Sequence, residues 1–217
     1  MKRAAMLWTG GKDSALALRV AREQGYDVGL LVTFAPEQGD FHAHPLPLID
    51  QQAKALGLPW RCVAITAPYE ESYRKALAGL VEEGWQVVIT GDIAEVDGHP
   101  NWIRERAEGL VLEVVTPLWD CQRDELVERV LAEGIKAVIS CVKVAALSSD
   151  WVGRELDAEA LADLRLLHRE KGVDLAGENG EYHTIVVDSP DFAWPLELPD
   201  FLLGGAGGLA WAEWRFG

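Results

Sequence analysis

The sequence predicts an α/β protein, with a doubly wound parallel sheet over residues 1–143 and a small C-terminal α+β lobe over residues 144–217. Short apolar runs alternate with amphipathic segments through the first part, which is the pattern of a parallel sheet wrapped by helices. Beyond Val142 this rhythm stops, and the chain continues with one helical segment, a polar stretch containing glycine and a tail rich in Pro, Gly and Trp. A chain of 217 residues is long enough to bury a core in both parts.

The expected elements follow from these runs in order. The strand candidates of the first part are short apolar runs bounded by turn residues, namely Ala4–Trp8, Val28–Phe34, Trp60–Ile65, Gln86–Thr90, residues 113–119 and Lys136–Val142. Two helices stop at Gly25 and Gly57, because glycine readily adopts the left-handed conformation that ends helices. The helix candidates are Ser14–Gln24, Pro47–Leu56, Tyr69–Glu83, Trp102–Gly109, Arg123–Glu133 and Asp157–Lys171, and the C-terminal lobe adds strands at 185–188 and Leu209–Phe216.

The charge, hydropathy, cysteines and histidines of the chain disfavour several classes of function. The formal net charge is −15, from 20 basic and 35 acidic residues, and this field disfavours binding to nucleic acid. We expect no membrane segment, because no apolar run approaches 18 residues. Three widely spaced cysteines without a CxxC pair favour a reducing cytoplasm. His42 and His44 lack a third ligand at a suitable spacing, which disfavours a zinc site.

The hexad TGGKDS, Thr9–Ser14, lies between the first predicted strand and the first predicted helix. Glycine amides and a helix start favour an anion there, and Lys12 adds a mobile cation, so the segment has the parts of a phosphate cradle. Its spacing fits neither the Walker loop nor the dinucleotide-binding motif. The alternative is a tight turn in which Asp13 or Ser14 caps the helix.

A second polar segment, GENGEYHT, spans residues 177–184 and precedes an apolar run. Two carboxylates, an amide, a phenol, an imidazole and a hydroxyl within eight residues could orient an amine and a carboxyl substrate, or assist proton transfer. The alternative is a solvated β-turn with Asn179-Gly180 at its corner.

TGGKDS resembles the SGGKDS signature of the PP-loop ATP pyrophosphatases, with Thr9 in place of the first serine. Together with GENGEYHT, it is similar to the diphthine-ammonia ligase family and its ATP-binding relatives, whose fold is that of the adenine nucleotide alpha-hydrolases. The similarity covers almost the whole chain. Further landmarks in the expected order are GDI at Gly91–Ile93, TPLW at Thr116–Trp119 and WVGRELD at Trp151–Asp157.

This resemblance implies an ATP-dependent ligase. A substrate carboxylate is adenylated with release of pyrophosphate, and ammonia then displaces AMP. In the family's named reaction the acceptor is diphthine on elongation factor 2. The resemblance implies that the catalytic residues, whose individual roles it does not give, are Lys12, Glu178, Glu181 and His183. The implied ATP-binding residues are Thr9, Gly10, Gly11, Lys12, Asp13, Ser14, His42, Gly91 and Asp92, and the implied substrate-binding residues are Asn179, Gly180, Tyr182 and Thr184. Mg²⁺ would come with ATP, with Asp13 as its candidate ligand.

Other interpretations stay open at this point. A PP-loop enzyme could act on another acceptor, such as a cobamide-related acid or a tRNA base, or the chain could be a nucleotide-binding module without catalysis. Cys141 could be a reactive thiol, although a small buried core residue is the stronger interpretation. Trp194, Trp211 and Trp214 are candidates for a surface through which a homo-oligomer forms.

Overall fold

The computed structural model describes residues 2–37, 41–95 and 101–216. It divides the chain into two compact units, each built from several chain segments. Unit 1 consists of Met1–Thr9, Asp13–Phe41 and Gly57–Asp120, and unit 2 of Gly10–Lys12, His42–Leu56 and Cys121–Gly217.

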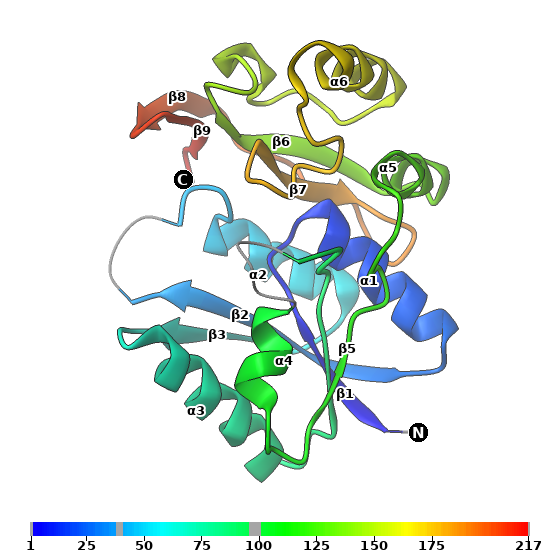
Figure 1. The fold of residues 1–217 in the computed structure, drawn as a ribbon, viewed down its shortest axis with the longest axis vertical. Helices are drawn as coiled ribbons and strands as arrows, with labels where there is room; N and C mark the ends of the chain where they lie inside the picture. Colours follow the sequence, from blue (N-terminus) through cyan, green and yellow to red (C-terminus); the bar gives the residue numbers. More distant parts are fainter. Residues whose placement is uncertain (1, 38–40, 96–100, 217) are drawn as a thin grey trace. The chain divides into compact units, whose positions relative to one another are not determined.

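Unit 1 contains a parallel sheet of five strands in the order β3-β2-β1-β4-β5 (Figure 1). Because the chain places β2 and β3 on one side of β1 and β4 and β5 on the other, the order reverses between β1 and β4, where such sheets bind ligands at the carboxyl ends of the strands. The doubly wound fold predicted from the sequence is confirmed. The strands are β1 (Arg3–Leu7), β2 (Asp27–Pro36), β3 (Trp60–Ile65), β4 (Val87–Ile89) and β5 (Glu113–Val115), with helices α1 (Lys12–Glu23), α3 (Tyr69–Glu82) and α4 (Trp102–Ala107).

One face of this sheet carries the core beneath α3 and α4, which lie side by side in Figure 1. The strands contribute alternate residues, since successive side chains of a strand point to opposite faces. Each large apolar side chain buried here stabilises the fold by about 1.5–3 kcal/mol. The buried members are Ala5, Leu30, Val32, Leu77, Leu80, Trp85, Val88, Ile103 and Ala107.

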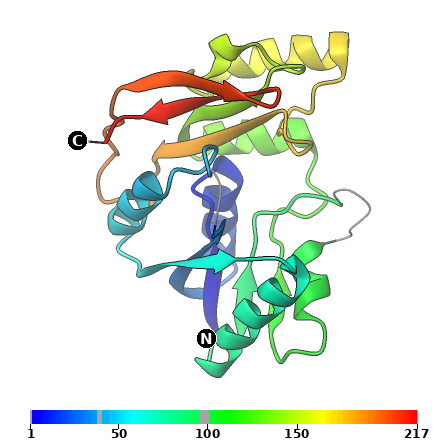
Figure 2. The same ribbon diagram turned by 90° about the vertical axis from the view of Figure 1, so that its left-hand side faces the viewer.

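Unit 2 contains an antiparallel sheet in the order β7-β6-β9-β8, with β8 at its outer edge (Figure 2). Gly207 and Gly208 both have positive φ, as a two-residue hairpin requires, and they join β8 to β9. Helix α6 begins where the Asp157 side chain accepts a hydrogen bond from the Ala160 amide (2.8 Å) and ends at left-handed Gly172. The elements are α2 (Leu46–Leu56), α5 (Arg123–Ala132), β6 (Lys136–Lys143), the 3₁₀ turn η1 (Ser149–Trp151), α6 (Ala158–Lys171), β7 (Tyr182–Asp188), β8 (Phe201–Ala206) and β9 (Leu209–Trp214).

Two strand predictions were wrong in detail, and a third strand was not predicted. The run Lys136–Val142 was expected to complete the parallel sheet, but β6 pairs antiparallel with both β7 and β9. A fully apolar run only indicates burial on both faces, and its direction is set by partners that come later in the chain. Strand β7 begins three residues earlier than the predicted run at 185–188, and β8 was not predicted, because its glycines resemble those of a loop.

Within the described part of the chain, no helix is both long and apolar enough to cross a membrane.

Candidate functional site

Thr9 and Ser14 meet at the carboxyl end of β1, in unit 1. Their hydroxyl oxygens lie 3.0 Å apart in a hydrogen bond, and the Thr9 amide also donates to the Ser14 Oγ (3.3 Å). Ser14 is buried. The first and last residues of the hexad are thus tied together, so the loop between them is held in a compact form.

Gly91 follows β4 and packs against the backbone at the start of α1. A Cβ atom at Gly91 would lie 2.9 Å from the carbonyl carbon of Asp13 and 3.0 Å from the Ser14 nitrogen. Only a residue without a side chain allows this approach. Unit 1 therefore brings together Thr9, Asp13, Ser14 and Gly91 at the topological switch point, where a ligand is expected.

Asp92 lies in a polar network beside this loop. Its Oδ2 accepts hydrogen bonds from the Thr90 hydroxyl (2.8 Å) and the Asn101 side-chain amide (2.7 Å). Asn101 is buried and caps α4 by accepting from the Arg104 amide (2.8 Å). Burial, followed by the charge of Asp92, raises the pKa of Tyr73 above its ordinary value. The Asp92 carboxylate is therefore held at the end of β4 by its hydrogen bonds with Thr90 and Asn101.

Lys12 belongs to unit 2, and its side chain is only 2% exposed. Its Nζ donates to the Ala176 carbonyl (2.5 Å) and lies 5.1 Å from the ring centroid of Tyr182. Its amide donates to the Thr184 Oγ1 (3.0 Å). The ammonium expected to be mobile is instead held by the segment GENGEYHT and its preceding residues. Two motifs separated by more than 160 residues meet at this lysine.

Gly10 is fixed by a residue that the sequence did not indicate. Its carbonyl accepts from the Val186 amide (2.8 Å) and from Gln52 Nε2 (2.9 Å), and the same Nε2 donates to the Val186 carbonyl (2.7 Å). Gln52 is fully buried. With φ at +79°, Gly10 has no room for a side chain, because a Cβ would lie 2.5 Å from Gln52 Oε1. Gly11 beside it is also buried.

Residues 177–181 form a turn that Glu181 organises. The Gly180 amide donates to the Gly177 carbonyl (3.0 Å), so Glu178 and Asn179 are the central residues of the turn. Glu181 is buried; its Oε2 accepts from the Asn179 amide (3.0 Å), and its Oε1 accepts from the Asn179 side chain (3.2 Å) and the Asp174 amide (3.1 Å). Glu178 is half-buried and Asn179 exposed at the tip.

One row of residues across the antiparallel sheet contains a histidine and a tryptophan, and two further histidines pack against them. Cys141 on β6 is opposite His183 on β7 and Trp211 on β9. His42 stacks on Trp211, with ring centroids 4.0 Å apart, and His44 meets His183 edge-on at 5.2 Å. Burial raises the pKa of the Cys141 thiol, so this cysteine has the properties of a core residue.

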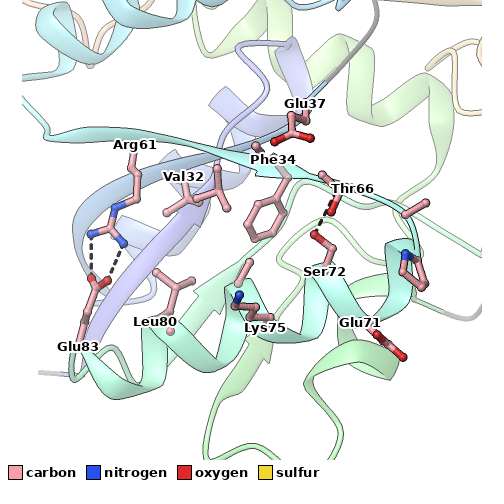
Figure 3. A pocket seen from close by; sticks show the side chains of 16 residues that line it. Val32, Phe34, Glu37, Arg61, Thr66, Glu71, Ser72, Lys75, Leu80 and Glu83 are labelled. Atoms are coloured by element: carbon pink, nitrogen blue, oxygen red, sulfur yellow. Dashed lines mark hydrogen bonds and ion pairs between the residues drawn. The ribbon is translucent and has the colours of Figure 1, made fainter.

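A hollow of about 570 Å³ lies elsewhere in unit 1, between β2, β3 and α3 (Figure 3). The Phe34 ring points into it, and the bidentate pair of Arg61 and Glu83 (2.7 and 2.8 Å) closes one end. No residue of TGGKDS or GENGEYHT lines it. The hollow is therefore separate from the candidate site.

The two clusters of candidate site residues belong to different units, since Gly91 lies in unit 1 and Gly10 in unit 2. Neither glycine has space for a Cβ atom, since protein atoms already lie there, so packing within the chain requires both. In unit 2, Lys12 follows Gly10 and Gly11 and supplies one cation, a combination suited to phosphate groups. Among the described residues no cluster of three His, Cys, Asp or Glu side chains could hold a metal ion by itself. Mg²⁺ bound with ATP needs only one or two carboxylates besides phosphate oxygens, and Asp13 in the first turn of α1 is such a group.

Comparisons with known proteins cover almost the whole chain. The family model of the diphthamide synthase N-terminal domain matches residues 1–112, and that of the diphthamide synthase C-terminal domain matches residues 122–203. Proteins named diphthine–ammonia ligase from Mus musculus and Homo sapiens are 28% and 27% identical, each over 88% of this chain and 80% of the relative. A solved structure described as a predicted subunit of tRNA methyltransferase, from Methanocaldococcus jannaschii, aligns with a TM-score of 0.50 and 18% identity, over 88% of this chain and 98% of that one, and supports the fold alone.

Proposed function

Because the chain belongs to the diphthamide synthase family, we propose that it is an ATP-dependent amide-forming ligase that joins ammonia to a carboxylate. A carboxylate oxygen of the acceptor attacks the α-phosphorus of ATP, and the bond to the β-phosphate oxygen breaks to release pyrophosphate. Ammonia then attacks the carbonyl carbon of the acyl-adenylate, AMP leaves with the bonding electron pair, and the nitrogen loses a proton.

The contact between TGGKDS and strand β7 is the observation that supports this proposal most directly. Lys12 donates through its backbone amide to Thr184 of the polar segment and through its ammonium to the carbonyl of Ala176 just before that segment, so the hexad and the polar segment meet at one residue. Adenylation requires such a junction, because the nucleotide and the acceptor carboxylate must be next to each other. In the reaction, Lys12 stabilises the charge that develops on the departing pyrophosphate.

On the nucleotide side, we assign phosphate contacts to Thr9, Gly10, Gly11 and Ser14, and contacts to the rest of the nucleotide to Gly91, Asp92 and His42. Mg²⁺ bound with ATP would be held by Asp13. When bound, this ion would neutralise part of the phosphate charge.

On the acceptor side, we assign proton handling to Glu178 and His183, whose half-buried side chains keep access to solvent. Glu181 holds the turn, since both of its carboxylate oxygens already accept hydrogen bonds within it. Asn179, Gly180, Tyr182 and Thr184 line the acceptor or ammonia site. The proposed acceptor is diphthine, which the names of the two mammalian relatives state, and the family resemblance implies that it is carried on elongation factor 2.

The test is release of pyrophosphate and AMP from ATP, with ammonium present and either diphthine-bearing elongation factor 2 or small carboxylic acids as acceptors. Lys12→Met should reduce the rate at least about 100-fold, the effect of losing a group that stabilises transition-state charge. Lys54→Met is the matched control, because Lys54 lies on the surface of unit 2 and pairs with Asp50 (2.6 Å). ADP as the product, or an equal rate for Lys12→Met and Lys54→Met, would contradict the proposal. Turnover with small acids but not with the elongation factor would contradict only the acceptor.

A further inference from the structure

The outer edge of the antiparallel sheet is an exposed, apolar and uncharged strand. In Figure 2, β8 is the orange-red strand beyond β9, and in the described sheet β9 is its only neighbour. Its sequence, FLLGGA, contains no charge and no proline. Leu202 and Leu203 are 51% and 56% exposed, values that are high for leucine in a strand.

Such an edge is unusual in a protein that remains monomeric. In an antiparallel pair, about every second residue directs its N–H and C=O groups away from the existing neighbour, so β8 presents a row of backbone donors and acceptors. Natural proteins normally protect these edges with lysine, proline, bulges or a covering loop. Strand β8 has neither of the first two, and it pairs in register with β9 from Phe201 to Ala206 without a bulge.

Other exposed apolar side chains belong to the same part of the chain. Trp194 (53% exposed) precedes β8 in the sequence, Leu209 begins β9 and Phe216 follows it. A hollow of about 460 Å³ is lined by Phe201 and Trp214, which pair at one end of β8 and β9. The exposed apolar character of this hairpin is therefore not confined to Leu202 and Leu203.

We propose that β8 pairs with β8 of a second copy of this chain, in antiparallel orientation about a two-fold axis. An edge strand is self-complementary in this arrangement, because each copy offers the other the same donors, acceptors and apolar side chains, and the assembly closes at two. Residues directly opposite each other in an antiparallel ladder share a face of the sheet, and a two-fold axis normal to the sheet keeps every side chain on its face. We therefore place Leu203 on the axis, opposite Leu203 of the partner subunit, so that Phe201 faces the partner's Gly205.

The charge distribution along the edge does not oppose pairing with a second copy, despite the net charge of −15. The nearest acidic group before the strand is Asp200. In this register, Asp200 and the partner's Asp200 lie about six residues apart along the ladder, roughly 20 Å at about 3.4 Å per residue. That separation exceeds the Debye length of about 8 Å at physiological salt, so the two carboxylates do not oppose pairing.

The test is the molar mass in solution, measured by light scattering from about 1 µM to about 100 µM, the range in which modest interfaces dissociate. We expect the wild-type chain to approach twice its mass of 23.8 kDa. Leu203→Lys places two ammonium groups across the two-fold axis and should weaken dimerisation at least about 100-fold, leaving monomer throughout. Leu166→Lys is the matched control, because Leu166 is 48% exposed on α6 of the same unit, and it should remain dimeric.

A monomeric wild-type chain at the highest concentration would overturn the proposal, as would a dimer that survives Leu203→Lys or dissolves equally with Leu166→Lys. If Leu203→Lys does not fold, Leu203→Cys replaces it: mild oxidation should cross-link two copies through position 203 but not through Leu166→Cys. Loss of binding to an acceptor protein by Leu203→Lys, with the wild type monomeric, would assign the edge to that protein and refute self-pairing.

Discussion

Gln52 should control both the stability of unit 2 and the affinity for ATP. Its Nε2 donates to the carbonyls of Gly10 (2.9 Å) and Val186 (2.7 Å) while the side chain is fully buried. Gln52→Leu keeps the approximate size of the side chain and removes both donors. A hydrogen bond contributes about 1 kcal/mol net, and a buried acceptor left without a donor costs about 1–3 kcal/mol. The Gly10 carbonyl keeps the Val186 amide, so we expect a loss of roughly 2–3 kcal/mol.

The effect on ATP follows from the same geometry. If Gly10 and its neighbours bind phosphate, a loop that has lost one of two restraints must be reordered when the nucleotide binds. A cost of about 1 kcal/mol weakens ATP binding by roughly fivefold to tenfold. Urea denaturation gives the stability and isothermal titration gives the affinity. Gln51→Leu is the control on the same helix, because Gln51 is only half-buried, and it should change stability by less than about 0.5 kcal/mol.

Gln52→Glu separates the hydrogen bonds from the shape of the side chain. A carboxylate cannot donate to the two carbonyls, whereas a protonated carboxyl can donate to one. Burial raises the pKa of the introduced carboxyl in the folded state above its value of about 4.3 in the unfolded chain. The unfolded state then releases its proton first, so stability should fall as pH rises above about 4.3, by at most about 1.4 kcal/mol per pH unit. Equal stabilities and equal ATP affinities for Gln52→Leu and Gln51→Leu would refute this role of Gln52.

Three further predictions concern other parts of the chain. Gly91→Ala should cost about 1–3 kcal/mol and weaken ATP binding, because its Cβ would meet backbone atoms at 2.9–3.1 Å, whereas Gly79→Ala, with open space inside α3, should stabilise by about 0.5–1 kcal/mol. Asp157→Ala should lower the melting temperature by about 2–4 °C through loss of about 1 kcal/mol of helix capping, and Asp157→Asn should restore most of it. The hydrogen bond with Arg61 lowers the pKa of Glu83, so this pair contributes above the ordinary pKa of 4.5 and is lost as pH falls through the lowered value. Because the pair is exposed, Glu83→Gln should reduce the stability difference between pH 7 and pH 3 by less than about 1 kcal/mol, measured by urea denaturation.

The elements of unit 1 could be predicted from the sequence because each depends on local pattern. Apolar runs indicated β1 to β5, and Gly25 after α1 ended that helix as expected, as Gly57 did for α2 of unit 2. The position of TGGKDS at the end of β1 follows from the same pattern. The doubly wound topology also placed Gly91 near that loop, since β4 lies beside β1.

The direction of β6 and the structural role of Gln52 could not be predicted from local pattern. Both depend on β7, which begins at Tyr182, so the deciding contacts join residues far apart in the chain, 134 positions in the case of Gln52 and Val186. A glutamine on an amphipathic helix is ordinarily a solvated residue. Only the fold shows that this one faces the interior and bridges two backbone carbonyls.

The polar segment illustrates how residue type and residue role separate. Glu178 and Glu181 have the same chemistry in the sequence, and both were candidates for proton transfer. In the folded chain Glu181 is buried, and both of its oxygens accept N–H groups of the turn, whereas Glu178 lies at the centre of the turn and keeps partial exposure. Because both Glu181 oxygens already accept hydrogen bonds within the turn, they are occupied by the structure of the turn itself. Glu181 therefore holds the shape of the turn, which is why we propose Glu178 and His183, and not Glu181, for the acid–base steps of the proposed reaction.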